Sequence, residues 1–195
     1  KQEGVFYSNA YQNPVVPGSV FKLVTSKAIL EAGIDDEKVE DEGKLVINGQ
    51  TIRNYGGTVH GTLTFEEGFV KSSNVYFMDR ALEMGGQALQ EAADSFLIGQ
   101  DIKLDFTTLT STFNLGDYED NVIASTAFGQ GETLITPLHM AMIAQSIGGD
   151  GEMLKPYLIQ SVVNGRGKTT QEGKAEVLTK TMDKKIAKRI REVMT

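Results

Sequence analysis

Residues 17–30 read PGSVFKLVTSKAIL, and this stretch decides the fold. The Pro-Gly pair at its start favours a turn. The apolar residues after it recur every three or four positions, as they do on one face of a helix. A helix is therefore predicted over residues 19–30. Gly33 is expected to end it, because glycine readily adopts the left-handed conformation found at helix C-termini.

The first turn of this predicted helix carries a serine and a lysine, Ser19 and Lys22, in the pattern S-x-x-K. Residues three positions apart lie on the same face of a helix, so the hydroxyl and the amine are neighbours. The helix N-terminus favours negative charge that develops at the serine. Apolar surroundings such as Phe21 favour the neutral form of the amine, which can then act as a base. The pattern alone is short enough to arise by chance.

A second short pattern, Ser72-Ser73-Asn74, lies between two predicted helices. A hydroxyl at Ser72 can relay a proton between the amine of Lys22 and a leaving group. The amide of Asn74 offers both a donor and an acceptor, which suits it to hold the lysine and a substrate amide. Taken alone, the triplet also fits a pair of helix caps, where serine and asparagine are preferred.

The rest of the chain alternates helices and short strands, without repeats or low-complexity tracts. The acidic run DDEKVEDE at residues 35–42 is expected to be solvated surface. A β-hairpin is expected over residues 44–53, with an Asn48-Gly49 turn, and a helix that opens with a capping box at residues 64–67 and runs towards Val70. Two further helices are expected over 75–84 and 87–96, interrupted at Gly85-Gly86, followed by a long loop with short helices over 105–132. The remaining expected elements are a helix over 138–147 after Thr136-Pro137, a strand over 157–163 and an amphipathic helix over 183–194.

Composition excludes several classes of protein. The chain has 195 residues, 40% of them hydrophobic, which is enough for a folded core. Its 19 basic and 26 acidic residues give a net charge of -7, which argues against nucleic-acid binding. The absence of cysteine excludes disulfides and thiol nucleophiles. The two histidines, His60 and His139, are too few for a histidine metal centre and are expected to be structural or surface residues.

Taken in order, the two short patterns resemble those of the transpeptidase domain of penicillin-binding proteins. That superfamily carries S-x-x-K, an S-x-N type triplet and K-T-G. The similarity extends over nearly the whole chain and points to the class B, monofunctional members. The segments that carry it are Pro17-Gly18-Ser19-Val20-Phe21-Lys22, Arg53-Asn54-Tyr55-Gly56-Gly57, His60-Gly61, Lys71-Ser72-Ser73-Asn74-Val75-Tyr76-Phe77, Phe128-Gly129-Gln130-Gly131-Glu132, Thr136-Pro137-Leu138-His139-Met140-Ala141 and Met153-Leu154-Lys155-Pro156-Tyr157-Leu158.

The resemblance implies a serine D,D-transpeptidase that cross-links peptidoglycan stem peptides and is acylated by β-lactams, with no metal or organic cofactor. The backbone N–H of the nucleophile would form half of an oxyanion hole. The residues that the resemblance assigns are Ser19 as the acylated nucleophile, Lys22 as the base, Ser72 as the proton relay, Asn74 as the residue that orients substrate and lysine, and Tyr55 and Ser73 as substrate contacts.

One element of the family pattern is missing. The sequence contains no Lys-Thr-Gly or Lys-Ser-Gly, and the nearest string, Lys168-Thr169-Thr170, precedes the last predicted helix. The expected architecture is therefore α+β and helix-rich: a fragment of the serine β-lactamase/transpeptidase-like fold, mainly its helical subdomain, with a β-hairpin and a C-terminal strand pair. Residues 1–195 are expected to form a single partial transpeptidase domain that lacks the KTG strand and the N-terminal strands, and that is at best weakly active alone.

Two other functions stay open on the sequence alone. One is a serine β-lactamase or β-lactam sensor, although Asn74 and Ser73 depart from the patterns of those enzymes. The other is a non-catalytic binding or scaffold module of the same fold, which the missing third pattern supports.

The partners expected on the leading interpretation are peptidoglycan stem peptides and β-lactams, with other cell-wall synthesis proteins as further candidates. The expected location is the extracytoplasmic face of the bacterial cell membrane. The basic run at residues 184–191 is expected to be a solvated helix face, with a membrane-surface role as the alternative.

Overall fold

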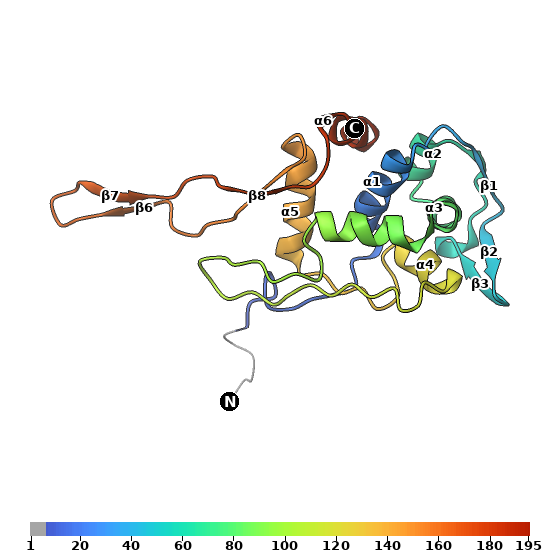
Figure 1. The fold of residues 1–195 in the computed structure, drawn as a ribbon, viewed down its shortest axis with the longest axis horizontal. Coiled ribbons are helices and arrows are strands. Elements are labelled where there is room, and N and C mark those ends of the chain that lie inside the picture. Colours follow the sequence, from blue (N-terminus) through green and yellow to red (C-terminus); the bar gives the residue numbers. More distant parts are fainter. Residues whose placement is uncertain (1–6) are drawn as a thin grey trace.

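The structure, a computed structural model, describes residues 7–195. Helices dominate it, and the short strands lie between them (Figure 1). The helices are η1 (Gly18–Phe21), α1 (Lys22–Ala32), η2 (Tyr55–Gly57), α2 (Phe65–Val70), α3 (Asn74–Ser95), α4 (Asp120–Ala127), α5 (Pro137–Gly148) and α6 (Lys184–Met194). The strands are β1 (Val39–Asp41), β2 (Lys44–Ile47), β3 (Gln50–Arg53), β4 (Gly61–Leu63), β5 (Glu152–Leu154), β6 (Ser161–Val163), β7 (Thr169–Glu172) and β8 (Val177–Lys180). The expected helix-rich α+β architecture is confirmed.

Helix α1 lies at the centre of the helical body, beside α3 (Figure 1). Its residues 22–29 are buried on all sides rather than along one stripe, as expected of a helix at the centre of a fold. The helix continues from the 3-10 turn η1 and ends at Gly33, whose φ of 70° and ψ of 32° are left-handed. The helix predicted over residues 19–30 and its glycine end are therefore confirmed.

Helix α3 is one bent helix in which the sequence predicted two. The bend lies at Gly85, whose φ of 81° and ψ of 163° interrupt the helical backbone. Glycine adopts this conformation without the steric cost that a Cβ would add. The N-terminal half buries Val75, Phe77 and Met78 in a hydrophobic cluster, which fixes the first turn of α3 against the body.

The hairpin β2–β3 agrees with its prediction. The strands are antiparallel, with Ile47 opposite Gln50. The turn residues Asn48 and Gly49 have φ values of 49° and 78°. Positive φ at both central positions is the requirement of a type I′ turn, and Asn-Gly is the pair that meets it most easily.

The prediction that the acidic run at residues 35–42 is solvated surface is wrong at its C-terminal end. There β1 pairs antiparallel with β4, and Asp41 is 0% exposed. Its carboxylate accepts hydrogen bonds from side chains of Asn54 and Ser73. A prediction from local charge places every carboxylate at the surface, because it takes no account of donors that are distant in the sequence.

The C-terminal region contains two strand pairs, β5–β8 and β6–β7, where one was expected. The β6–β7 hairpin projects away from the helices, and its strand residues are exposed (Figure 1). The strand predicted over residues 157–163 is confirmed only as β6, since residues 157–160 pair with no strand in the described part of the chain. None of the helices in residues 7–195 is long and apolar enough to span a membrane.

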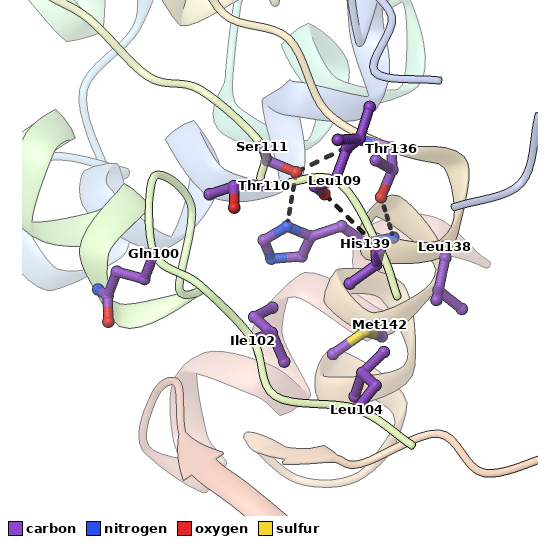
Figure 2. A pocket seen from close by; sticks show the side chains of 11 residues that line it. Gln100, Ile102, Leu104, Leu109, Thr110, Ser111, Thr136, Leu138, His139 and Met142 are labelled. Atoms are coloured by element: carbon purple, nitrogen blue, oxygen red, sulfur yellow. Dashed lines mark hydrogen bonds between the residues drawn. The ribbon is translucent and has the colours of Figure 1, made fainter. Parts of the chain in front are cut away.

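A buried histidine ties helix α5 to the segments before it (Figure 2). The Nδ1 atom of His139 lies 2.8 Å from the hydroxyl of Ser111, and Nε2 lies 2.7 Å from the carbonyl oxygen of Phe96. Burial lowers the pKa of His139, so the neutral ring donates to the carbonyl and accepts from the serine. Thr136 caps the helix and Pro137 begins it, as predicted. His139 thus has the expected structural role.

Candidate active site

Ser19, Ser72 and Asn74 line one cleft, with a volume of about 450 Å³. Four separate segments of the chain meet there: the start of the first helix, the turn η2 and its neighbours, the α2–α3 junction, and the loop after α4. The other residues that line it are Gly18, Asn54, Tyr55, Thr58, His60, Lys71, Phe128 and Gln130. The cleft therefore brings together residues that are more than one hundred positions apart in the sequence.

Ser19 lies exposed in η1, directly before α1. The turn beneath it is held by Gly129, whose carbonyl accepts from the Gly18 N–H at 3.0 Å. A Cβ at Gly129 would lie 1.9 Å from the Gly18 carbonyl oxygen, and the φ of Gly129 is +79°. This close approach requires glycine at position 129. The loop after α4 thereby fixes the backbone from which the Ser19 side chain points into the cleft.

Lys22 is buried, with 3% of its surface exposed, yet its amine has three acceptors. Its Nζ atom donates to the backbone oxygen of Ser72 at 2.6 Å, to the Ser72 hydroxyl at 3.0 Å and to Oδ1 of Asn74 at 2.9 Å. The ring of Phe77 lies 5.4 Å away, measured to its centroid. The S-x-x-K lysine and the second pattern are thus in direct contact, as the sequence-based interpretation requires.

Burial lowers the pKa of Lys22 from its usual 10.5 to about 8. Each pKa unit corresponds to about 1.4 kcal/mol, so removal from water disfavours the ammonium by roughly 3 kcal/mol. Among the described residues, no carboxylate pairs with Lys22 to offset this effect. At pH 7 about a tenth of the lysine is therefore neutral, and this is the form that can accept a proton.

The geometry around Nζ determines where its lone pair points. A neutral amine keeps two N–H groups, and two of its neighbours, the Ser72 carbonyl and Asn74 Oδ1, can only accept. The third neighbour, the Ser72 hydroxyl, is the one that can also donate. With both N–H groups on the pure acceptors, the lone pair faces the Ser72 hydroxyl.

The hydroxyls of Ser19 and Ser72 lie 3.0 Å apart and are hydrogen-bonded. In the described residues, Lys22 reaches Ser19 through Ser72 and not by a direct hydrogen bond. Ser72 has a φ of 52°, an uncommon conformation for a residue with a Cβ. Its N–H bonds to the Phe69 carbonyl at 2.9 Å, and this turn between α2 and α3 keeps its side chain between the other two groups.

Asn74 is the first residue of α3, and both the oxygen and the NH₂ group of its side-chain amide form hydrogen bonds. Oδ1 accepts from Lys22, and Nδ2 donates to the Arg53 carbonyl at 3.1 Å. Those two contacts fix which way the amide faces. The structure thus brings Ser19, Lys22, Ser72 and Asn74 into one hydrogen-bonded chain.

The two residues proposed as substrate contacts lie in different surroundings. Tyr55 is 97% exposed at the edge of the cleft, so its assigned role stays a prediction. Ser73 is 0% exposed and does not line the cleft. Its hydroxyl donates to Asp41 at 2.6 Å and accepts from the Tyr76 N–H at 2.9 Å, which makes it the N-cap of α3. The assignment of Ser73 to substrate contact does not fit this position.

Several residues at or near the cleft were not predicted from the sequence to belong to the site. Asn54, in a quoted segment but with no role assigned, accepts from the N–H groups of Asn74 and Val75. The carboxylate of Asp41 accepts hydrogen bonds from the side chain of Asn54. No sequence signal distinguished Asp41 from its acidic neighbours. His60, expected to be structural or a surface residue, lines the cleft. In the part of the chain that the structure describes, no cluster of His, Asp and Glu could hold a metal ion.

Comparison with known proteins extends the likeness to the whole chain. The family described as Penicillin binding protein transpeptidase domain matches residues 1–195. The peptidoglycan D,D-transpeptidase PbpA of Mycobacterium tuberculosis is 34% identical over 154 residues, which cover 75% of this chain and 31% of that relative. The chain therefore spans about a third of the length of that curated relative.

Solved structures show the same arrangement of elements. The D,D-transpeptidase domain of a peptidoglycan glycosyltransferase from Eggerthella lenta matches with a TM-score of 0.91 at 27% identity, over 98% of this chain and 50% of that one. Penicillin-binding protein A from M. tuberculosis, in an imipenem acyl-enzyme complex, matches with a TM-score of 0.88 at 26% identity, over 95% of this chain and 44% of that one. Sequence and backbone therefore agree on the same relatives.

Proposed function

The chain belongs to the penicillin binding protein transpeptidase domain family, and on that premise we propose that it performs serine acyl transfer on the D-Ala-D-Ala ends of peptidoglycan stem peptides. The observation that carries the proposal is the chain of hydrogen bonds from Ser19 through Ser72 to Lys22. The name of the relative from M. tuberculosis, a peptidoglycan D,D-transpeptidase, supports the substrate class.

In the acylation step, the Ser19 oxygen attacks the carbonyl carbon of the D-Ala-D-Ala peptide bond. Its proton passes to the Ser72 oxygen while the Ser72 proton passes to the lone pair of Lys22. Hydroxyl hydrogens rotate freely, so both can point towards the lysine in its neutral form. The C–N bond then breaks, the proton returns along the same path to the leaving nitrogen, and D-alanine departs, leaving an ester on Ser19.

In the transfer step, an amine of a second stem peptide attacks that ester, loses its proton to the same relay and releases Ser19. A β-lactam would enter by the first step: opening its ring amide forms the ester on Ser19. The imipenem acyl-enzyme of penicillin-binding protein A supports this part of the proposal. The expected location is the extracytoplasmic face of the bacterial cell membrane, where peptidoglycan and the other proteins of cell-wall synthesis lie.

We expect the reaction of this chain alone to be slow. The sequence contains no Lys-Thr-Gly, the third pattern of the superfamily. The resemblance to the superfamily implies that the strand carrying this pattern supplies the second donor to the oxyanion. Loss of one such donor costs about 10²–10³ in rate. Slow formation of an adduct that persists is therefore the behaviour that the proposal predicts.

A fluorescent penicillin tests the proposal directly. Incubation for hours followed by denaturing electrophoresis is expected to label the chain, and Ser19→Ala is expected to abolish the label. Ser161→Ala, at an exposed serine of the projecting β6–β7 hairpin, is the matched control and is expected to keep it. Equal labelling of the Ser19→Ala chain would refute the proposal. Rapid loss of label by hydrolysis would instead favour the β-lactamase alternative.

A further inference from the structure

Asp41, the last residue of β1, is a buried carboxylate without a cationic partner in the described residues. Its Oδ1 accepts from the Gly43 N–H at 2.7 Å and from Asn54 Nδ2 at 2.8 Å. Its Oδ2 accepts from Asn54 Nδ2 at 2.8 Å and from the Ser73 hydroxyl at 2.6 Å. Burial of an unpaired charge is costly even when it is hydrogen-bonded. The hydrogen bonds that hold the carboxylate connect β1 to Asn54 and to Ser73, the N-cap of α3.

The contact with Asp41 fixes the direction of the Asn54 amide. A carboxylate offers only acceptors, so the NH₂ group of Asn54 must face it, and that group also donates to the Thr58 carbonyl at 2.8 Å. The amide oxygen of Asn54 is thereby turned towards α3. There it accepts from the N–H groups of Asn74 at 2.8 Å and Val75 at 3.1 Å.

The contact with Asp41 fixes Ser73 in the same way. Because its hydroxyl hydrogen is given to Asp41, the oxygen is free to accept, and it takes the Tyr76 N–H at 2.9 Å. Asp41 therefore directs both side chains that bind free N–H groups of the first turn of α3. A helix start held from two sides has little freedom to rotate or fray.

Asn74 lies in that first turn and connects it to Lys22 by a hydrogen bond. Its backbone N–H is held by Asn54 and its side-chain NH₂ by the carbonyl of Arg53, the residue before Asn54. The only group left to face Lys22 is Oδ1, at 2.9 Å. With that acceptor occupied by an N–H of the amine, the lone pair of a neutral Lys22 faces Ser72.

We propose that Asp41 is a positioning residue for the reaction: through Asn54 and Ser73 it sets the direction of the Asn74 amide and so aims the lone pair of Lys22 at the Ser72 hydroxyl. Asp41 does not line the cleft and touches no reacting atom. The inference rests on the proposed acyl transfer for its purpose. The arrangement around Lys22 exists and can be measured whether or not Ser19 reacts.

The test is the titration of Lys22 in the full chain, followed by NMR of ¹³C-labelled lysine. In Asp41→Asn one oxygen is replaced by an NH₂ group that faces donors, so Asn54 and Ser73 lose their fixed directions and no longer hold the first turn of α3, which carries Asn74. The ammonium form of Lys22 then loses an acceptor, and its pKa is expected to fall below about 8, by roughly one further unit. Labelling by fluorescent penicillin is expected to slow at least about tenfold.

Thr136→Ala is the matched control, because Thr136 is a buried N-cap like Ser73 but caps α5, away from the cleft. It is expected to leave both the Lys22 titration and the labelling rate unchanged. A folded Asp41→Asn chain whose Lys22 pKa is unchanged or higher overturns the proposal. A wild-type chain that penicillin never labels, with a shifted Lys22 pKa in Asp41→Asn, refutes the proposed function and leaves the positioning role standing.

If Asp41→Asn does not fold, Ser73→Ala is the variant that tests the positioning role of Asp41. It removes one of the three donors to Asp41 and the N-cap hydroxyl of α3, as Thr136→Ala removes the N-cap hydroxyl of α5. A lower Lys22 pKa in Ser73→Ala than in Thr136→Ala supports the proposal. Equal values in the two variants overturn it.

Discussion

The hydroxyl of Ser72 lies 3.0 Å from that of Ser19 and 3.0 Å from the amine of Lys22, so one side chain bridges nucleophile and base. The bridge depends on a left-handed backbone at Ser72, with a φ of 52°. Such a conformation is uncommon outside glycine and is maintained when the surrounding structure determines it.

The rate at which penicillin acylates Ser19 should follow the titration of Lys22. The base is the neutral amine, and burial lowers its pKa to about 8. Below that value the neutral fraction rises tenfold per pH unit, so the rate should rise by about the same factor and level off above pH 8. Stopped samples taken across pH 6 to 9.5 with fluorescent penicillin measure this.

Lys22→Arg is the informative variant for that profile. A guanidinium keeps its proton over the whole range, so the rise with pH should disappear and the rate should fall by about 10² or more. A wild-type rate that is flat between pH 6 and 8 would contradict the role of Lys22 as base.

Gly129→Ala should disturb the turn that carries Ser19. The new Cβ would lie 1.9 Å from the Gly18 carbonyl, at a position where φ is +79°. Overpacking and left-handed strain together predict a loss of about 3 kcal/mol in the free energy of unfolding, measured in urea, and slower acylation. Gly167→Ala, with φ of +75° and open space around its Cβ, is the control and should cost about 1 kcal/mol. Equal losses at the two positions would refute the close-packing argument.

The buried histidine in Figure 2 predicts a loss of stability in mild acid. Burial holds the pKa of His139 below its usual 6.5 in the folded chain. The unfolded chain therefore binds the proton more tightly, and stability present above pH 6.5 is lost as the pH falls through 6.5. His139→Gln removes the titrating ring, so its melting temperature should fall less than that of the wild type between pH 7 and 5.5.

His60→Gln serves as the control for that comparison, because His60 lies half-buried at the cleft and not among the partners of His139. It should retain the acid sensitivity of the wild type in differential scanning calorimetry. If His139→Gln keeps the full decrease in melting temperature, the histidine is not its source.

Local patterns predicted the elements that local physics determines. The left-handed Gly33, the Asn48-Gly49 turn and the Thr64 capping box appear where the sequence places them. Each of these depends on residues within a few positions of one another, so one sequence suffices to recognise it. The same holds for the break at Gly85, although the sequence could not tell one bent helix from two.

Long-range contacts set the features that the sequence missed. The burial of Asp41 depends on Asn54 and Ser73, which lie 13 and 32 positions away. Charge composition alone assigns such a residue to the surface. Ser73 was misplaced for the same reason: its pattern shows that a hydroxyl is present, but not whether that hydroxyl faces the cleft or the core.

The central claim, that Ser19 is the nucleophile, is tested most directly by mass spectrometry of the chain after prolonged incubation with penicillin. We predict an adduct of one penicillin per chain, located on Ser19 by fragmentation of its tryptic peptide, and no adduct in Ser19→Ala. An adduct on a different residue, or none in the wild type, would contradict the account.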